Sequence, residues 1–283
     1  MTAHIHRRAE HANSDALVLK QARLDALLQD LGGAVVAFSG GVDSAYLLAA
    51  AFRVLGERCV AATAERIAGT LGVRHVRVET REFEDPRYLR NDAHRCYFCK
   101  HALFTELTAL ARTLGLPAVI YGANADDRGD YRPGMRAAEE FAVRAPLLDA
   151  GLDKTDVRAL ARRIGLEVWD KPAAPCLASR LPFGAPVTMT ALSQIEAAEG
   201  VLHRLGFREV RVRHHGTRAS IEVPVAEIPR LSSLFDGVAE TLRAIGFAAA
   251  QIAPDGLRSG RLSAQFAPAR GAAPASGGQV QNP

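Results

Sequence analysis

The chain contains 283 residues, of which 48% are hydrophobic and 23% charged, and its formal net charge is +4. This composition is typical of a globular protein that buries a sizeable core, and it excludes a membrane-spanning protein because no apolar stretch approaches the required length. The N-terminus has charge but no apolar signal segment, so we expect a cytoplasmic protein without a membrane partner.

Helical and strand-like patterns alternate in the first part of the chain. The apolar spacing predicts helices over 15–31, 44–56, 65–72, 100–115 and 154–165, and short buried strands over 34–38, 58–64, 74–80 and 118–124. Asp153 is placed to cap the last helix and Gly165 to end it. This order is typical of an α/β fold with a parallel sheet covered by helices on both faces, where ligands bind beyond the carboxyl ends of the strands.

The pattern changes after residue 185. Helices are predicted over 191–207 and 228–247, and the alternating segments 209–215 and 218–224 predict a hairpin around Gly216. We therefore expect a flexible N-terminal tail, a large α/β domain, a small α+β domain and a Pro/Gly/Ala/Ser-rich disordered tail, over residues 1–14, 15–185, 186–266 and 267–283.

The string SGGVDS, residues 39–44, follows the first predicted strand and opens the next helix. It lacks the lysine of a Walker loop, yet Gly40 and Gly41 allow backbone N–H groups to close around an anion at the helix N-terminus. Ser39 and Ser44 add hydroxyl donors, and Asp43 can hold Mg²⁺ against phosphates. The alternative is a glycine-rich turn with only a structural role.

SGGVDS resembles the PP-loop of the N-type ATP pyrophosphatases. The resemblance implies that Mg²⁺ and ATP bind here, that pyrophosphate is released, and that AMP becomes attached to a substrate oxygen. The nucleotide-binding residues it implies are Ala37, Ser39, Gly40, Gly41, Asp43, Ser44, Thr63, Gly122 and Asp126. Asp126 is a candidate second magnesium ligand, but it could also be a capping residue.

Longer segments resemble the LarE family of ATP-dependent sulfur transferases. They include HRCYFCKHALF (94–104), WDKPAAPCLASRLPFG (169–184) and EVRVRHHG (209–216), within a resemblance that covers residues 17–265. The family converts the two carboxylates of pyridinium-3,5-biscarboxylic acid mononucleotide to thiocarboxylates, on the way to a nickel-pincer nucleotide. One departure is that Glu65 directly follows Ala64, where the resemblance leads us to expect a longer, proline-containing segment beside the nucleotide.

The cysteines bear on the source of sulfur. From the residues alone, Cys96 and Cys99 could form a redox pair or half of a zinc site with His94 or His101. The family resemblance implies two further versions: a single Cys176 that gives up its own sulfur, or Cys96, Cys99 and Cys176 holding a [4Fe–4S] cluster with one open iron. This chain matches the three-cysteine version, whereas Cys59 lies in an apolar strand and is expected to fill the core.

The segment EVRVRHH predicts that Arg211 and Arg213 share one face of a strand, outside the inward-facing Val210 and Val212. Two guanidinium groups on one face can clamp a phosphate or carboxylate, although a solvated strand face is the alternative. The resemblance favours a substrate-phosphate site that also includes Arg180 and Arg258. Among the acids on the preceding helix we take Glu199 as the candidate general base; a surface role is the alternative for it and for Glu196.

Taken together, the sequence predicts a two-domain sulfurtransferase with Cys176, Asp43 and Glu199 as catalytic candidates. Its partners would be a small-molecule nucleotide, sulfide or another sulfur donor, and further copies of itself in a homo-oligomer, without nucleic acid. The rival functions are tRNA thiolation, ammonia-dependent amidation and a metal-binding scaffold without activity.

Overall fold

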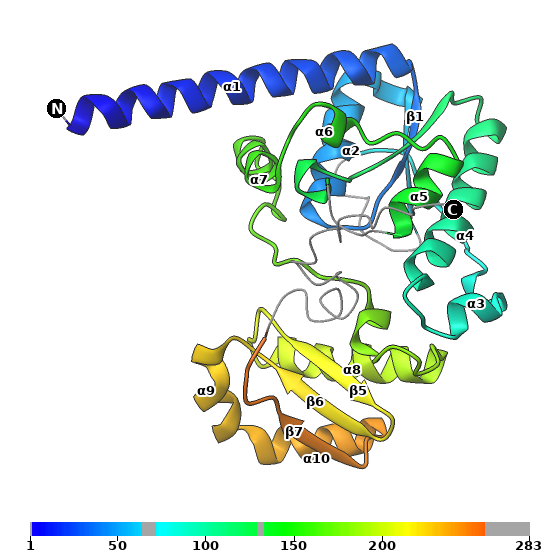
Figure 1. The fold of residues 1–283 in the computed structure, drawn as a ribbon, viewed down its shortest axis with the longest axis vertical. Coiled ribbons are helices and arrows are strands. Elements are labelled where there is room, and N and C mark those ends of the chain that lie inside the picture. Colours follow the sequence, from blue (N-terminus) through cyan, green and yellow to red (C-terminus); the bar gives the residue numbers. More distant parts are fainter. Residues whose placement is uncertain (1, 64–71, 129–132, 258–283) are drawn as a thin grey trace, which may run out of the picture.

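The computed structural model describes residues 2–63, 72–128 and 133–257, with side chains described from residue 15 onward. Two lobes follow one another along the chain, a larger one with a parallel sheet and a smaller one with a mixed sheet (Figure 1). Among the helices of the described ranges, none is long and apolar enough to cross a membrane.

The larger lobe is built on four parallel strands in the order β3-β2-β1-β4. These are β1 (Ala34–Ala37), β2 (Cys59–Thr63), β3 (His75–Arg77) and β4 (Ala118–Tyr121). Every residue of β1 is buried, which is the pattern of a strand whose two faces are both covered.

The helices cover both faces of this sheet. Ala34 and Val36 of β1 join a core formed with α1 (Thr2–Leu31), α2 (Val42–Leu55) and α7 (Lys154–Arg163). Val35 and Ala37 point to the other face, against α4 (Arg95–Thr113) and α5 (Pro133–Glu140). The predicted α/β class with a doubly covered parallel sheet is thus confirmed.

Short elements connect the main ones in this lobe. They are η1 (Gly56–Arg58), η3 (Glu82–Glu84), α3 (Pro86–Leu89), η4 (Ala125–Asp127), α6 (Pro146–Asp149) and η5 (Leu177–Arg180). The sequence placed the start of α4 at residue 100, but the helix begins at Arg95 and therefore includes Cys96 and Cys99. The helix expected over 65–72 lies almost wholly outside the described residues.

The smaller lobe contains α8 (Met189–Arg204), β5 (Arg211–His215), β6 (Arg218–Glu222), η6 (Val225–Glu227), α9 (Ile228–Ser233), α10 (Phe235–Ile245) and β7 (Ala249–Ile252). Strands β5 and β6 form the predicted antiparallel hairpin. The sequence missed β7, an alanine-rich segment of low strand propensity that pairs in parallel with β6. The segment predicted as one helix over 228–247 is divided into α9 and α10.

A separate apolar cluster joins the two lobes. Tyr88 of α3 packs there with Ala178 and Leu181 of the η5 segment and with Ile195 of α8. The cysteine-bearing segments meet beside this cluster. The division at residue 185 remains a prediction, as does the flexible tail over 1–14, for which α1 shows helix from Thr2 onward. The tail expected over 267–283 lies outside the described residues.

Candidate active site between the two lobes

The SGGVDS loop folds back on itself between β1 and α2. Gly40 has a φ of +73°, a conformation that side-chain-bearing residues rarely adopt. The hydroxyl of Ser44 donates to the carbonyl of Gly41 at 3.0 Å and accepts from the N–H of Ser39 at 3.2 Å. The turn therefore presents the N-terminus of α2 at the carboxyl edge of the sheet, where anions are favoured.

Gly122, directly after β4, lies against this loop. A Cβ atom at Gly122 would lie 2.9 Å from the backbone nitrogen of Ser44 and 3.1 Å from the carbonyl carbon of Asp43. The shorter distance is one that real Cβ atoms essentially never show, so no larger residue fits while the loop backbone keeps its place. A glycine at position 122 is therefore required by close packing against the backbone of Asp43 and Ser44.

Asp43 is held by two donors from other parts of the chain. Its Oδ1 accepts from the Asn124 side chain at 3.1 Å, and its Oδ2 forms an ion pair with Lys154 at the start of α7. The backbone N–H of Lys154 donates to Asp126 at 3.0 Å, so Asp126 acts as a capping acceptor here. Asp43 and Asp126, the two carboxylates expected to hold Mg²⁺, therefore both contact Lys154. Carboxylate oxygens are suitable ligands for Mg²⁺.

Two lysines from later parts of the chain contact the SGGVDS loop, which contains no lysine itself. Besides Lys154, the ammonium of Lys171 donates to the carbonyl of Gly40 at 3.2 Å. The sequence reasoning missed both residues. The available signal for Lys154 was its position directly after the capping Asp153, because the predicted helix begins at the ligand-binding edge of the sheet.

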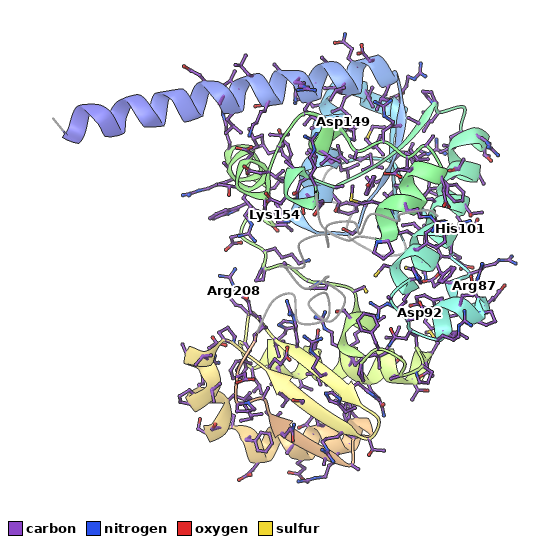
Figure 2. All side chains as sticks on the ribbon, in the orientation of Figure 1. Arg87, Asp92, His101, Asp149, Lys154 and Arg208 are labelled. Carbon is purple, nitrogen blue, oxygen red and sulfur yellow. The ribbon has the colours of Figure 1, made fainter. Side chains whose placement is uncertain are left out.

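Lys171 also lines a pocket that continues into the smaller lobe. Its lining includes the ionisable side chains of Lys171, Arg180, Glu199, His203, Arg208, Glu209 and Arg211. Figure 2 shows Lys154 on the larger lobe and Arg208 on the facing edge of the smaller one. The lysine that contacts the SGGVDS loop thus lines the same pocket as Arg180 and Arg211, two of the arginines predicted for the substrate phosphate.

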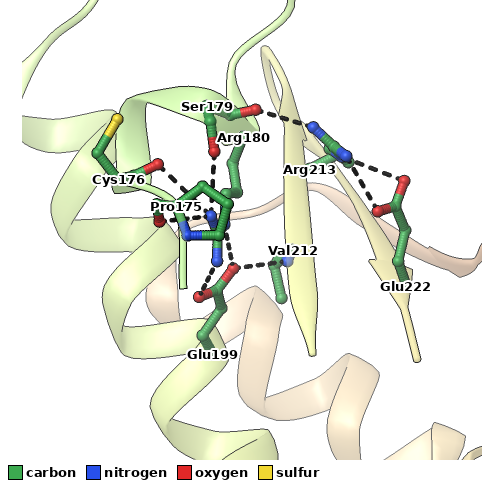
Figure 3. Close-up of polar contacts among 8 residues, drawn as sticks. All are labelled: Pro175, Cys176, Ser179, Arg180, Glu199, Val212, Arg213 and Glu222. Atoms are coloured by element: carbon green, nitrogen blue, oxygen red, sulfur yellow. Dashed lines mark hydrogen bonds and ion pairs between the residues drawn. The ribbon is translucent and has the colours of Figure 1, made fainter. Parts of the chain in front are cut away.

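Arg180 and Glu199 form a buried pair in this pocket (Figure 3). The guanidinium donates from Nε to Oε1 at 2.7 Å and from its second terminal nitrogen to Oε2 at 3.1 Å. The N–H of Val212 donates to the same Oε1 at 3.0 Å. Glu199 therefore orients Arg180 and β5, while its assignment as a general base stays a prediction.

Arg211 and Arg213 both face the η5 segment, and Arg211 is only 8% exposed. Arg213 donates to the carbonyl of Ser179 at 2.8 Å and pairs with Glu222 of β6 at 3.1 Å. Burial, followed by the neighbouring charges of Arg180 and Arg213, lowers the pKa of Arg211. Three guanidinium groups thus lie together with the two carboxylates of Glu199 and Glu222, and the excess of positive charge is favourable for an anionic ligand. Arg258 lies outside the described residues.

The three cysteines come from two segments. Cys96 and Cys99 lie at the start of α4, and Cys176 directly precedes η5, with its thiol directed away from Arg180 (Figure 3). The pKa of Cys99 is raised to about 12, above all by burial and then by nearby charges that include Cys176 and Cys96. The thiols are therefore near enough to act on one another.

These donors fit an iron–sulfur cluster by their chemistry, because thiolates are its usual ligands. Within the described ranges, however, no three His, Cys, Asp or Glu side chains are grouped as a metal site. Cys96 and Cys176 are both exposed, so each thiol is accessible to a ligand from solvent.

The other residues named in the sequence analysis, Ala37, Thr63 and Cys59, lie in strands of the parallel sheet. Ala37 and Thr63 end two adjacent strands; the side chain of Thr63 is not among those described. Cys59 is buried in the core as predicted, and burial raises its pKa to about 12. The junction of Ala64 and Glu65, where a longer loop was expected, lies outside the described residues.

Comparison with curated proteins finds relatives that cover most of this chain. A protein of Lactiplantibacillus plantarum called pyridinium-3,5-bisthiocarboxylic acid mononucleotide synthase is 37% identical in an alignment that covers 87% of this chain and 95% of that protein. The uncharacterized protein slr1717 of a Synechocystis species is 39% identical over 83% of this chain and 93% of its own length. The uncharacterized protein MJ0830 of Methanocaldococcus jannaschii is 27% identical over 67% of this chain and 77% of its own. A scan of protein-family models finds none that matches.

Proposed function

Because the chain belongs to the LarE family, we propose that it uses ATP to replace carboxylate oxygens of pyridinium-3,5-biscarboxylic acid mononucleotide by sulfur. The observation that carries this proposal is a pocket lined by Arg180, Arg211 and Lys171, because Lys171 also donates to the carbonyl of Gly40 in the SGGVDS loop. A site of this shape suits two anionic partners, a nucleoside triphosphate and a substrate phosphate.

In the first step, a substrate carboxylate oxygen attacks the α-phosphorus of ATP and pyrophosphate leaves. The N-terminus of α2, Ser39 and Ser44 would hold the pyrophosphate, and Asp43 would bind Mg²⁺. The ammonium of Lys154 now sits where that cation would act. Bound Mg²⁺ would release Lys154 from Asp43 to contact the polyphosphate, so positive charge is kept beside the leaving group throughout.

The smaller lobe would hold the substrate nucleotide. Arg211 and Arg213 share one face of β5 and would bind its phosphate, with Arg180 beside them. Glu199 fixes Arg180 through two hydrogen bonds, so the guanidinium is oriented before the substrate arrives. Such fixed donors lower the entropic barrier of positioning the carboxylate against ATP.

In the second step, sulfur replaces the oxygen that carries AMP. We propose that Cys96, Cys99 and Cys176 hold a [4Fe–4S] cluster, which would supply sulfide bound at its open iron. Cys176 is exposed and directly precedes η5, the element that contains Arg180, which supports a sulfur donor on the segment that would also bind the substrate. Two rounds convert the two carboxylates.

A second candidate donor is Cys176 itself. Within the described residues the three thiols are not grouped as a metal site, which favours a donor that needs one thiol only. Its thiolate would form a thioester with the acyl-adenylate and expel AMP. Loss of the Cα proton would then break the Cβ–S bond, leaving dehydroalanine in the protein and a thiocarboxylate in the product.

The test is a reaction of anaerobically purified protein, with and without iron and sulfide reconstitution, in Mg-ATP and the biscarboxylate mononucleotide. We expect AMP, pyrophosphate and a thiocarboxylate product, identified by mass spectrometry, over many turnovers of the reconstituted protein. A protein that turns over once and loses the mass of hydrogen sulfide would support Cys176 as the donor. A product that contains no sulfur in either arm would overturn the proposed function.

A further inference from the structure

The ligands of the proposed sulfur site come from two segments that need a fixed relation to each other. Cys96 and Cys99 belong to α4, whereas Cys176 belongs to a loop that leads into the smaller lobe. Three thiols on two segments hold one group with less loss of conformational freedom when the segments are already fastened together.

Arg95 makes that connection. It is the first residue of α4 and only 5% exposed. One terminal nitrogen of its guanidinium donates to the carbonyl of Ala178 at 2.7 Å and to the side-chain oxygen of Asn91 at 2.6 Å. Ala178 follows Cys176 by two residues, so this bond ties the Cys176 segment directly to the helix of the other two cysteines.

Asn91 extends the same attachment. Its side-chain nitrogen donates to the carbonyls of Pro182 and Ala185, both at 2.8 Å, and the residue is fully buried. Arg95 holds the opposite end of this amide through Oδ1. The two residues together therefore fix the chain from Ala178 to Ala185 against the start of α4.

The charge of Arg95 has no carboxylate partner in the part of the chain that the structure describes. Its second terminal nitrogen lies 3.9 Å from the Sγ atom of Cys96 and is directed to it as a donor. A buried guanidinium without a counterion is costly, and buried charges in proteins are normally paired. An anion held by the neighbouring thiols would balance this charge.

The apolar cluster between the lobes brings the same two segments together. Tyr88 of α3 and Ala178 are buried in this cluster, and Cys99 packs against it. Among the described contacts, Glu82 forms no ion pair with Arg95.

We infer that Arg95 is a positioning residue of the three-cysteine site: it fastens the Cys176 segment to α4 and supplies the positive charge that balances the anionic group bound between the thiols. This inference rests on the proposed function. It assigns to Arg95 a role that requires both its hydrogen bonds and its charge.

The first test measures proximity of the thiols without metal. Iron-free wild-type protein, Arg95→Met and Arg112→Met are treated with a short thiol-to-thiol cross-linker, and peptides joining Cys176 to α4 are quantified by mass spectrometry. Arg112 is an exposed arginine of the same helix and serves as the matched control. We expect a several-fold lower yield in Arg95→Met only, with far-ultraviolet circular dichroism unchanged. Equal yields in all three proteins would overturn the positioning role.

The second test measures the charge. After anaerobic reconstitution, iron and sulfide are counted and the reduction potential is measured for wild type, Arg95→Lys and Arg95→Met. Removing a positive charge beside a cluster makes it harder to reduce, so we expect less iron and a more negative potential in Arg95→Met. Arg95→Lys keeps the charge and should stay closer to the wild-type potential.

The outcomes separate the two claims. Full iron content and an unchanged potential in Arg95→Met would overturn the charge role. Wild-type protein that takes up no iron would overturn the cluster of the proposed function, and with it the charge role. In that case the cross-linking yields would still decide whether Arg95 places Cys176.

Discussion

Lys154 at the start of α7 forms an ion pair with Asp43 in the first turn of α2, across 111 residues of the chain. The pair brings a cation to the SGGVDS loop, which has no lysine of its own and which we propose to bind phosphate. Asn124 holds the other oxygen of the same carboxylate, so three segments of the sheet edge converge on Asp43.

We predict that Lys154→Met lowers kcat/KM for ATP by at least about tenfold, which corresponds to about 1.4 kcal/mol of lost transition-state stabilisation. The reason is that positive charge beside the polyphosphate is removed. Pyrophosphate release under varied ATP measures it. The control is Lys20→Met, because Lys20 pairs with Asp156 of the same helix. Equal losses in both variants would assign the effect to α7 stability.

Gly122→Ala should weaken the proposed ATP binding by about tenfold or more, near 1.4 kcal/mol, because the added methyl group displaces the backbone of the SGGVDS loop. Calorimetric titration with an unreactive ATP analogue measures the dissociation constant. Gly237→Ala is the matched control, since a Cβ atom there meets nothing within 4 Å and alanine favours the helix. Unchanged affinity in Gly122→Ala would contradict the close approach of β4 to the loop.

Glu199→Ala should destabilise the fold by about 3–5 kcal/mol, because it leaves the buried guanidinium of Arg180 unpaired. Glu199→Gln keeps an acceptor and should lose less. Urea unfolding measures both variants. The exposed pair of Arg208 and Asp170 is the comparison, and Asp170→Ala should leave the unfolding midpoint unchanged. Similar midpoints for Glu199→Ala and Asp170→Ala would show that the Arg180–Glu199 pair is not buried in solution.

His214 should make the stability of the protein depend on pH. Burial lowers its pKa, so the unfolded chain takes up a proton at a higher pH than the folded chain does. This contribution to stability is complete above the ordinary histidine pKa of about 6.5 and is lost as the pH falls below it. His214→Phe should flatten the pH dependence of the unfolding midpoint, whereas His215→Gln, on an exposed neighbour, should not. An unchanged slope in His214→Phe would contradict the burial of this ring.

Local patterns were enough to predict the parallel sheet, the glycine loop and the hairpin that carries Arg211 and Arg213. These features depend on residues that are close in sequence, such as the alternation in 209–215. The partners of the site residues depend on chain segments that meet only after folding. Lys154 at Asp43, Lys171 at Gly40 and Arg95 at Ala178 each join residues that no spacing rule connects.

Two differences between the predicted and the observed elements, at β7 and at the start of α4, have local causes. The strand β7 was missed because its alanines carry no strand signal, and it exists because β6 offers it an edge. Helix α4 was predicted to begin after the cysteines, but Arg95 and its bond to Asn91 anchor an earlier start. The earlier start of α4 bears on the proposed function, since it places Cys96 and Cys99 on a helix.

The most direct test of sulfur transfer compares wild-type protein with Cys176→Ala under the same anaerobic reaction. Pyrophosphate and thiocarboxylate are quantified together, so that activation of the carboxylate and sulfur transfer are separated. We predict that Cys176→Ala still releases pyrophosphate at close to the wild-type rate but forms no thiocarboxylate. Thiocarboxylate formation by Cys176→Ala at the wild-type rate would contradict the account.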